Sequence, residues 1–104
     1  MTARLDQLLK LHAADPADAE LCYMIGLEHG KAGAVDDALA WLDKALAADP
    51  AFGYAYFQKG KHLMDIGRDA DAADALDAGI AAAREAGDAK ALGELQELRA
   101  SIEG

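Results

Sequence analysis

A spacing of 34 residues recurs along the chain. Shifting the sequence by 34 positions superimposes an Asp-Pro pair and two glycines, which are Asp15-Pro16 on Asp49-Pro50, Gly26 on Gly60 and Gly33 on Gly67. Leu8, Leu42 and Leu76 carry the same register through three copies. A fixed period of this length is typical of folds in which one small unit stacks on the next.

Each period is expected to contain two helices. Apolar residues recur at intervals of three and four, whereas the alternation typical of strands is absent. Asp15 is expected to cap the second helix, with Pro16 in its first turn, and the second Asp-Pro pair repeats this signal before the fourth helix. Gly33 and Gly67 suit helix C-termini, since glycine accepts left-handed backbone there. The expected helices span 3–14, 17–32, 35–48, 51–66, 69–86 and 88–103.

The residues at fixed positions in each period resemble the tetratricopeptide repeat (TPR) family. Its pattern places an aromatic residue, a Leu-Gly pair, a Tyr, an Ala, a Phe and a Pro at set offsets. The first copy holds Cys22, Ile25, Gly26, His29, Ala38, Leu42 and Pro50, and the second holds Tyr56, Lys59, Gly60, Leu63, Ala72, Leu76 and Arg84. The resemblance implies an all-α, right-handed α-solenoid of antiparallel helix pairs with about six helices, as in small bacterial TPR proteins. It also implies one domain over 1–104, with capping helices at 3–14 and 88–103 around repeats at 17–50 and 51–86.

Small residues are expected where the two helices of a pair cross. Gly60 removes a side chain from one helix, Ala72 leaves little from the facing helix, and Gly26 and Ala38 are their equivalents in the first copy. A large residue such as Leu76 then fills the space between helix pairs.

The C-terminal part departs from the repeat pattern. Arg84 stands in place of the closing proline and Gly79 in place of a small helix-forming residue, so the fifth helix is expected to run past the usual turn. In the last helix, Glu94, Glu97 and Arg99 are expected to face away from an apolar stripe. That stripe consists of Leu92, Leu95, Leu98 and Ile102. A helix of this kind fits a cap, because the last face of a stacked array would otherwise expose its core.

Composition excludes several classes of partner. The 104 residues include 10 Lys and Arg against 19 Asp and Glu, so the formal charge is −9. Nucleic acid and anionic membrane surfaces attract the opposite sign of charge, so neither is expected to bind. No apolar run approaches the roughly 18 residues of a transmembrane helix, and no signal peptide is expected. The single cysteine, Cys22, cannot form an internal disulfide, which favours a reducing cytoplasm.

The residue set does not favour an enzyme, a metal site or a cofactor site. Cys22 and His29 lie seven residues apart on one expected helix, about 10 Å along its axis, which is too far for easy ligation of one metal. Cys22 is expected to be a small buried hydrophobe, and His12 a packed or edge residue. Ser101 has no catalytic partner motif. Exposure to solvent explains the acidic residues of the second helices, which are Asp36, Asp37, Asp69, Asp71, Asp74 and Asp77.

The resemblance implies that the first helices of successive pairs line a concave surface used for binding. The residues expected to line this groove are Tyr23, Leu27, Lys31, Tyr54, Phe57, Gln58, Lys61 and Met64, joined by Glu20 and Met24 and extended by Leu92 and Leu95. Aromatic and Met side chains suit anchoring roles, because the rings bury a large area and Met adapts its shape. An alternative is that Tyr23 and Phe57 merely pack between helices.

The predicted function is a non-enzymatic protein-interaction module. Family members that clamp a chaperone C-terminus use inward Lys and Asn residues four apart, and here those positions hold Tyr23 with Leu27 and Phe57 with Lys61. An apolar peptide or amphipathic helix is therefore the expected partner. The alternative is a structural subunit that forms a homodimer through the same aromatic face.

Overall fold

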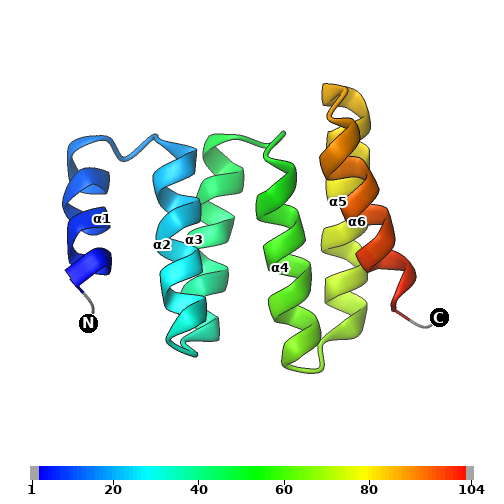
Figure 1. Cartoon of the computed structure of the whole chain (residues 1–104), viewed down its shortest axis with the longest axis horizontal. Helices are drawn as coiled ribbons and strands as arrows, with labels where there is room; N and C mark the ends of the chain where they lie inside the picture. The colour runs from blue at the N-terminus through cyan, green and yellow to red at the C-terminus, as the bar shows by residue number, and fades with distance from the viewer. Residues whose placement is uncertain (1–2, 103–104) are drawn as a thin grey trace. The chain divides into compact units, whose positions relative to one another are not determined.

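The chain forms six helices and, within the part that the structure describes, no strands. The computed structural model describes residues 3–102 (Figure 1). The helices are α1 (Ala3–Ala14), α2 (Ala19–Lys31), α3 (Val35–Ala48), α4 (Gly53–Asp65), α5 (Asp69–Ala86) and α6 (Ala89–Ala100). The predicted all-α class is confirmed. The helices divide into two compact units, one of α1–α3 that ends at Pro50 and one of α4–α6 that begins at Ala51.

The predicted N-cap of α2 is wrong by three residues. The cap is Asp18, whose carboxylate accepts hydrogen bonds from the backbone N–H groups of Glu20 at 2.9 Å and Leu21 at 3.2 Å. Asp15 instead accepts a hydrogen bond from the Asp18 N–H at 3.2 Å, which closes a turn around Pro16. Proline suits such a turn because its ring fixes φ near −65°, so the chain turns before the helix begins.

The second Asp-Pro pair also lies outside the helix that it was predicted to start. Asp49 ends α3, because its backbone N–H donates to the carbonyl of Ala45 at 2.8 Å. The next helix has Phe52 as its N-cap residue and begins at Gly53, two residues later than predicted. At the other end of this unit, α6 stops at Ala100, and the predicted end at 103 lies outside the described residues.

The predicted glycine stops are confirmed. Gly33 has φ 77° and Gly67 has φ 78°, the left-handed conformation that residues with a Cβ atom avoid. The chain bonds back across the second of these glycines, where the Arg68 N–H donates to the Leu63 carbonyl at 2.8 Å. The prediction that the fifth helix runs on is also confirmed, since α5 has 18 residues and ends only at Gly87.

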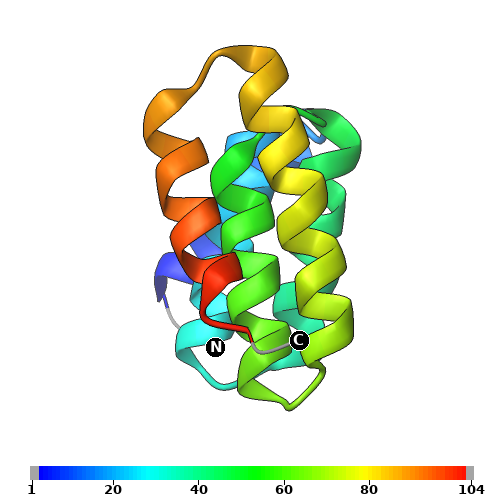
Figure 2. The same ribbon diagram turned by 90° about the vertical axis from the view of Figure 1, so that its right-hand side faces the viewer.

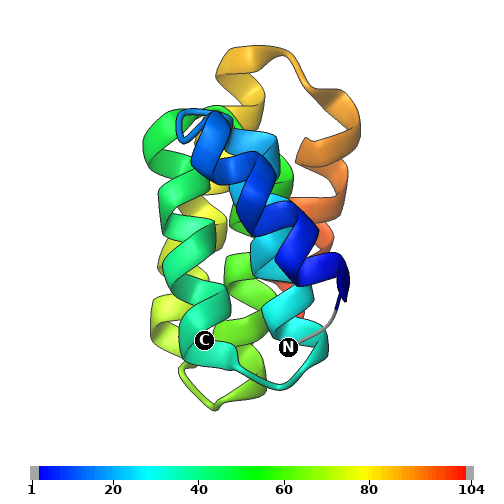
Figure 3. The same ribbon diagram turned by 90° about the vertical axis from the view of Figure 1, so that its left-hand side faces the viewer.

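The core of the first unit lies between α1, α2 and α3. Figure 3 shows α1, in blue, lying over α2. Leu5 and Leu8 of α1 are buried with Ile25 of α2, and partly buried side chains such as Trp41 of α3 surround them. The edge of the His12 ring meets Trp41 with 4.8 Å between ring centroids, so the prediction of a packed histidine is confirmed.

The core of the second unit lies between α4, α5 and α6, which pack side by side (Figure 2). Its buried residues are Leu76, Ala83, Ala91 and Leu95. Gly60 faces Leu76 so closely that a Cβ atom on the glycine would lie 2.6 Å from the Leu76 Cγ atom. The equivalent distance at Gly26 in the first unit is 3.2 Å, to Cγ of Leu42. The predicted crossings at small residues are therefore confirmed.

Gly79 marks a close contact that involves all three helices of the second unit. A Cβ atom at this position would lie 2.6 Å from Cβ of Tyr56 in α4 and 3.1 Å from Cδ2 of Leu95 in α6. The Tyr56 Cβ atom is fixed to its backbone, so no rotamer change relieves such a clash. The departure from the family pattern at Gly79 is thus a requirement of packing.

We expect Gly79→Ala to lower the free energy of unfolding by about 1–3 kcal/mol, because overpacking outweighs the gain in helix propensity. Gly93→Ala is the matched control, since this glycine lies in α6 with no atom within 4 Å of an added Cβ. The control is expected to raise stability by about 0.5–1 kcal/mol. Urea unfolding followed by circular dichroism measures both, and equal effects of the two substitutions would contradict the packing described.

We also expect Leu8→Ala to loosen α1, whereas Leu11→Ala on the same helix leaves it in place. Leu8 is 3% exposed and Leu11 is 55% exposed, so only the first change opens a cavity, at a cost of about 2–5 kcal/mol. Trp41 is the only tryptophan and contacts His12 of α1, so its emission reports the position of this helix. A spectrum unchanged in Leu8→Ala and shifted in Leu11→Ala would refute the assignment.

Candidate functional site

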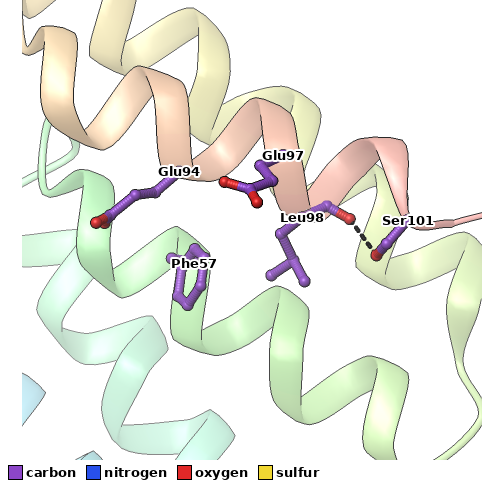
Figure 4. Close-up of a pocket in the computed structure, with 5 residues that line it drawn as sticks. All are labelled: Phe57, Glu94, Glu97, Leu98 and Ser101. Carbon is purple, nitrogen blue, oxygen red and sulfur yellow. Dashed lines mark hydrogen bonds between the residues drawn. The ribbon is translucent and has the colours of Figure 1, made fainter.

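A pocket opens between α4 and α6 in the second unit. Its volume is about 450 Å³, within the range of about 300–1,000 Å³ for pockets that hold small ligands. The described residues that line it are Phe57, Glu94, Glu97, Leu98 and Ser101 (Figure 4). The Phe57 ring on α4 faces the Leu98 side chain on α6, with the two carboxylates along the same helix (Figure 4).

The side chains that line the pocket come from facing sides of two helices. Glu94, Glu97 and Leu98 of α6 and its C-cap residue Ser101 follow one another at intervals of three, one and three, which keeps them on one side of the helix. Phe57 comes from the stripe of α4 that faces α6. The two helices are close at their first turns, where a Cβ atom on Gly53 would lie 2.9 Å from Cβ of Ala91. The pocket lies about one to three turns further along the chain, from Glu94 to Ser101.

Polar contacts hold the C-terminal half of α6. The Arg99 Nε atom lies 2.9 Å from Oδ1 of Asp77 on α5. The Ser101 hydroxyl donates to the carbonyl of Leu98 at 2.6 Å (Figure 4). Since Arg99 is 29% and Asp77 58% exposed, solvent screens this ion pair, which contributes at most about 1 kcal/mol. Its position matters more, because it ties α6 to α5 on the side away from the pocket.

The pocket combines an apolar surface with negative charge. Phe57 and Leu98 supply the apolar part, and Glu94 and Glu97 supply two carboxylates. Among the described lining residues no side chain carries a positive charge. The arrangement can therefore hold an apolar group and a cation. The hydroxyl of Ser101 donates to the Leu98 carbonyl.

Five of the predicted groove residues belong to the second unit, and one of them lines the pocket. That residue is Phe57, which also packs with Tyr54 against the core of this unit. Gln58 and Met64 are half-buried, whereas Lys61 is exposed. Phe57 therefore packs between helices, as the alternative proposed, and its ring also lines the pocket.

The other three predicted groove residues belong to the first unit. Tyr23 and Leu27 are half-buried on α2. Lys31 is exposed, and its ammonium group lies 3.1 Å from Oε1 of Glu28, which also pairs with Arg4 of α1 at 3.5 Å. Lys31 therefore shares the Glu28 carboxylate with Arg4 and stays largely exposed. A binding role for the eight predicted residues stays a prediction.

The predictions about the last helix are partly wrong. Glu97 is exposed, as predicted, whereas Glu94 is half-buried, and both line the pocket with Phe57. Arg99 is half-buried and pairs with Asp77 of α5. Leu95, at 0% exposure, belongs to the core and cannot extend a binding surface. The sequence contained the regular spacing of Glu94, Glu97, Leu98 and Ser101, but the apolar stripe beside these residues was the stronger signal.

Cys22 lies in the core of the first unit, as predicted. It is 1% exposed, and burial raises the pKa of its thiol above the usual value. A neutral buried thiol is a poor nucleophile, because the thiolate is the reactive form. Among the described residues no group of three His, Cys, Asp or Glu side chains could hold a metal ion.

The second helices of both repeats carry the predicted exposed acidic residues. Asp36 and Asp37 lie at the surface of α3, and Asp69, Asp71, Asp74 and Asp77 lie at that of α5. Asp71 is bound to Arg68, with 2.7 Å between Oδ2 and Nη2. No described helix combines the length and the apolar character that crossing a bilayer requires.

The chain is similar to solved structures of repeat proteins. No model of a protein family matches it, and neither does any curated protein sequence. A TPR domain protein from Salinibacter ruber is 34% identical in its crystal structure, which has a TM-score of 0.77 and covers 84% of this chain and 97% of that one. Its solution structure gives 36% identity and a TM-score of 0.80, over 86% and 91% of the two chains.

A third structure shares the fold at lower identity. The TPR2B domain of yeast Sti1, solved as a complex with pHsp70, is 23% identical with a TM-score of 0.86, over 92% of this chain and 77% of that one. The Salinibacter matches extend over most of both chains at more than 30% identity. Together with the 34-residue period and the glycine crossings, they show that the chain belongs to the tetratricopeptide repeat family.

Proposed function

We propose that this protein is a non-enzymatic interaction module that binds a short apolar or amphipathic segment of another protein. The observation that carries the proposal is the pocket between α4 and α6, where Phe57 and Leu98 present apolar surface beside an opening of about 450 Å³. An aromatic ring that lines such a pocket is a typical anchor for a partner side chain.

Family membership supports the same function. The yeast TPR2B domain shares the fold and was solved with pHsp70, so a domain of this shape can hold a protein partner. The chaperone-binding arrangement is not carried over, because Phe57 and Lys61 occupy one of the two clamp positions and Tyr23 and Leu27 the other. An apolar anchor fits these residues better than a bound carboxylate does.

The helix faces predicted from the sequence are part of the proposal as further contacts, each within its own unit. On α4, Tyr54, Gln58, Lys61 and Met64 flank Phe57 along the helix. On α2, Tyr23 and Leu27 are the candidates, together with Lys31. A homodimer formed through the aromatic face remains an outcome of the test below. We place the protein in the cytoplasm, where the buried Cys22 thiol fits a reducing environment.

The proposal is tested with peptides selected from a random library displayed on phage against the immobilised protein. Fluorescence anisotropy of the synthesised peptides then measures Kd. Phe57→Ala is expected to weaken binding at least tenfold, because truncating an anchor costs about 2 kcal/mol or more. Leu11→Ala is the control, since it removes an exposed apolar side chain from α1 and is expected to leave Kd unchanged.

Phe57 also contacts the core, so a second variant separates binding from folding. Ser101→Phe adds bulk at an exposed position that lines the pocket and removes no core contact. It is expected to weaken the same peptides while circular dichroism and the melting temperature stay close to those of the wild type. Peptides that bind both pocket variants as tightly as the wild type would exclude the pocket. Sedimentation velocity showing a tight dimer that Phe57→Ala dissociates would favour the homodimer instead.

A further inference from the structure

The pocket between α4 and α6 also indicates the charge of its partner, an inference that rests on the proposed function. We infer that the partner segment carries an apolar side chain that enters the pocket and Lys or Arg side chains that bind Glu94 and Glu97. Three features support this assignment, which are the two carboxylates of the pocket, its apolar surface and the partial burial of Glu94.

The two pocket carboxylates have no cationic partner among the described residues, unlike three other carboxylates of the chain. Glu28, Asp71 and Asp77 each form an ion pair with an Arg or Lys side chain. No ion pair or hydrogen bond joins the side chain of Glu94 or Glu97 to another described residue. They lie three residues apart on one helix, a spacing at which like charges repel. A cation from outside would relieve that repulsion.

The apolar surface explains why charge alone is not enough. An exposed ion pair contributes only about 0.2–1 kcal/mol, so a purely basic segment would bind weakly and without a fixed position. Phe57 and Leu98 supply the contact that fixes one side chain of the partner. The recognised feature is therefore an apolar residue with basic residues beside it.

Loss of water from the Glu94 carboxylate on binding disfavours neutral and acidic partner segments. Glu94 is already half-buried, and a bound segment would remove more water from its carboxylate. Covering a charge without pairing it is costly, so a neutral segment loses part of what the apolar contact gains. An acidic segment adds repulsion to this loss. The formal charge of −9 on the chain acts in the same direction over longer distances.

The cations of the partner are expected to face α6 and not α4. Lys61 lies one turn beyond Phe57 on α4 and is exposed, so it would repel a basic group on that side. Among the described residues it does not line the pocket. A segment with its basic residues on one side of the apolar residue is therefore expected to bind in one orientation. Its basic side would face Glu94 and Glu97, and its other side would face Lys61.

The experiment uses the tightest peptide from the phage selection as a scaffold. Two capped versions keep its apolar residues and carry either Lys or Glu at every flanking position. Their Kd values are measured by anisotropy at about 0.15 M salt, where charges beyond about 8 Å are screened. The wild-type protein is expected to bind the Lys peptide about tenfold more tightly than the Glu peptide, because the first gains two ion pairs and the second adds repulsion.

Variants locate the source of this preference. Glu94→Gln with Glu97→Gln is expected to remove most of it, and Glu94→Lys with Glu97→Lys to invert it. The matched control is Asp74→Asn with Glu85→Gln, which removes the same charge from exposed positions of α5 and is expected to keep the preference. A control that loses as much preference as the pocket variant would overturn the inference, because net charge alone would then explain the result.

The outcomes separate this inference from the proposed function. If peptides bind in a manner that depends on Phe57 but show no preference for Lys, the interaction module stands and the partner chemistry is wrong. Tighter binding of the Glu peptide than of the Lys peptide would likewise overturn the partner chemistry and leave the interaction module standing. If the library yields no peptide that binds, or binding ignores Phe57→Ala and Ser101→Phe, both are overturned.

Discussion

The structure depends on helices that approach one another where a side chain is missing. At Gly79 of α5, Tyr56 of α4 and Leu95 of α6 occupy the space that a Cβ atom would need. Because these two side chains come from different helices, this one position fixes the spacing of three. Gly60 against Leu76 repeats the arrangement between α4 and α5. Interiors packed at this density tolerate little added volume, so the positions of the three helices are determined together.

Most of the fold could be predicted because helix packing repeats its requirements along the sequence. The period aligned Gly26 with Gly60, and both proved to lie at crossings. Loop details were less accessible. An Asp before a Pro suits a helix start and a turn equally well, and only the position of Asp18 decides between them, since its carboxylate reaches two backbone N–H groups of α2. The sequence contained that aspartate, but the repeated Asp-Pro pair was the stronger pattern.

The pocket was harder to predict than the fold. Phe57 was identified as a surface aromatic residue, whereas its neighbours Glu94 and Glu97 were assigned to the solvent side of the last helix. A hydrophobic stripe shows which side of a helix is buried, but not how far its edges extend over a neighbouring helix. On α6 the polar edge of the stripe lies over α4 and the other side is bound to α5 through Arg99. That rotation depends on contacts between distant residues.

The contacts that position α6 also account for the open pocket. The helix is fastened to α4 near its start, where Ala91 meets Gly53, and to α5 near its end, where Arg99 meets Asp77. Between these points, nothing in the described chain fills the space in front of Phe57 and Leu98. Closing that space would require rotating α6, which would withdraw Leu95 from the core. The position of Leu95 in the core therefore accounts for the open pocket.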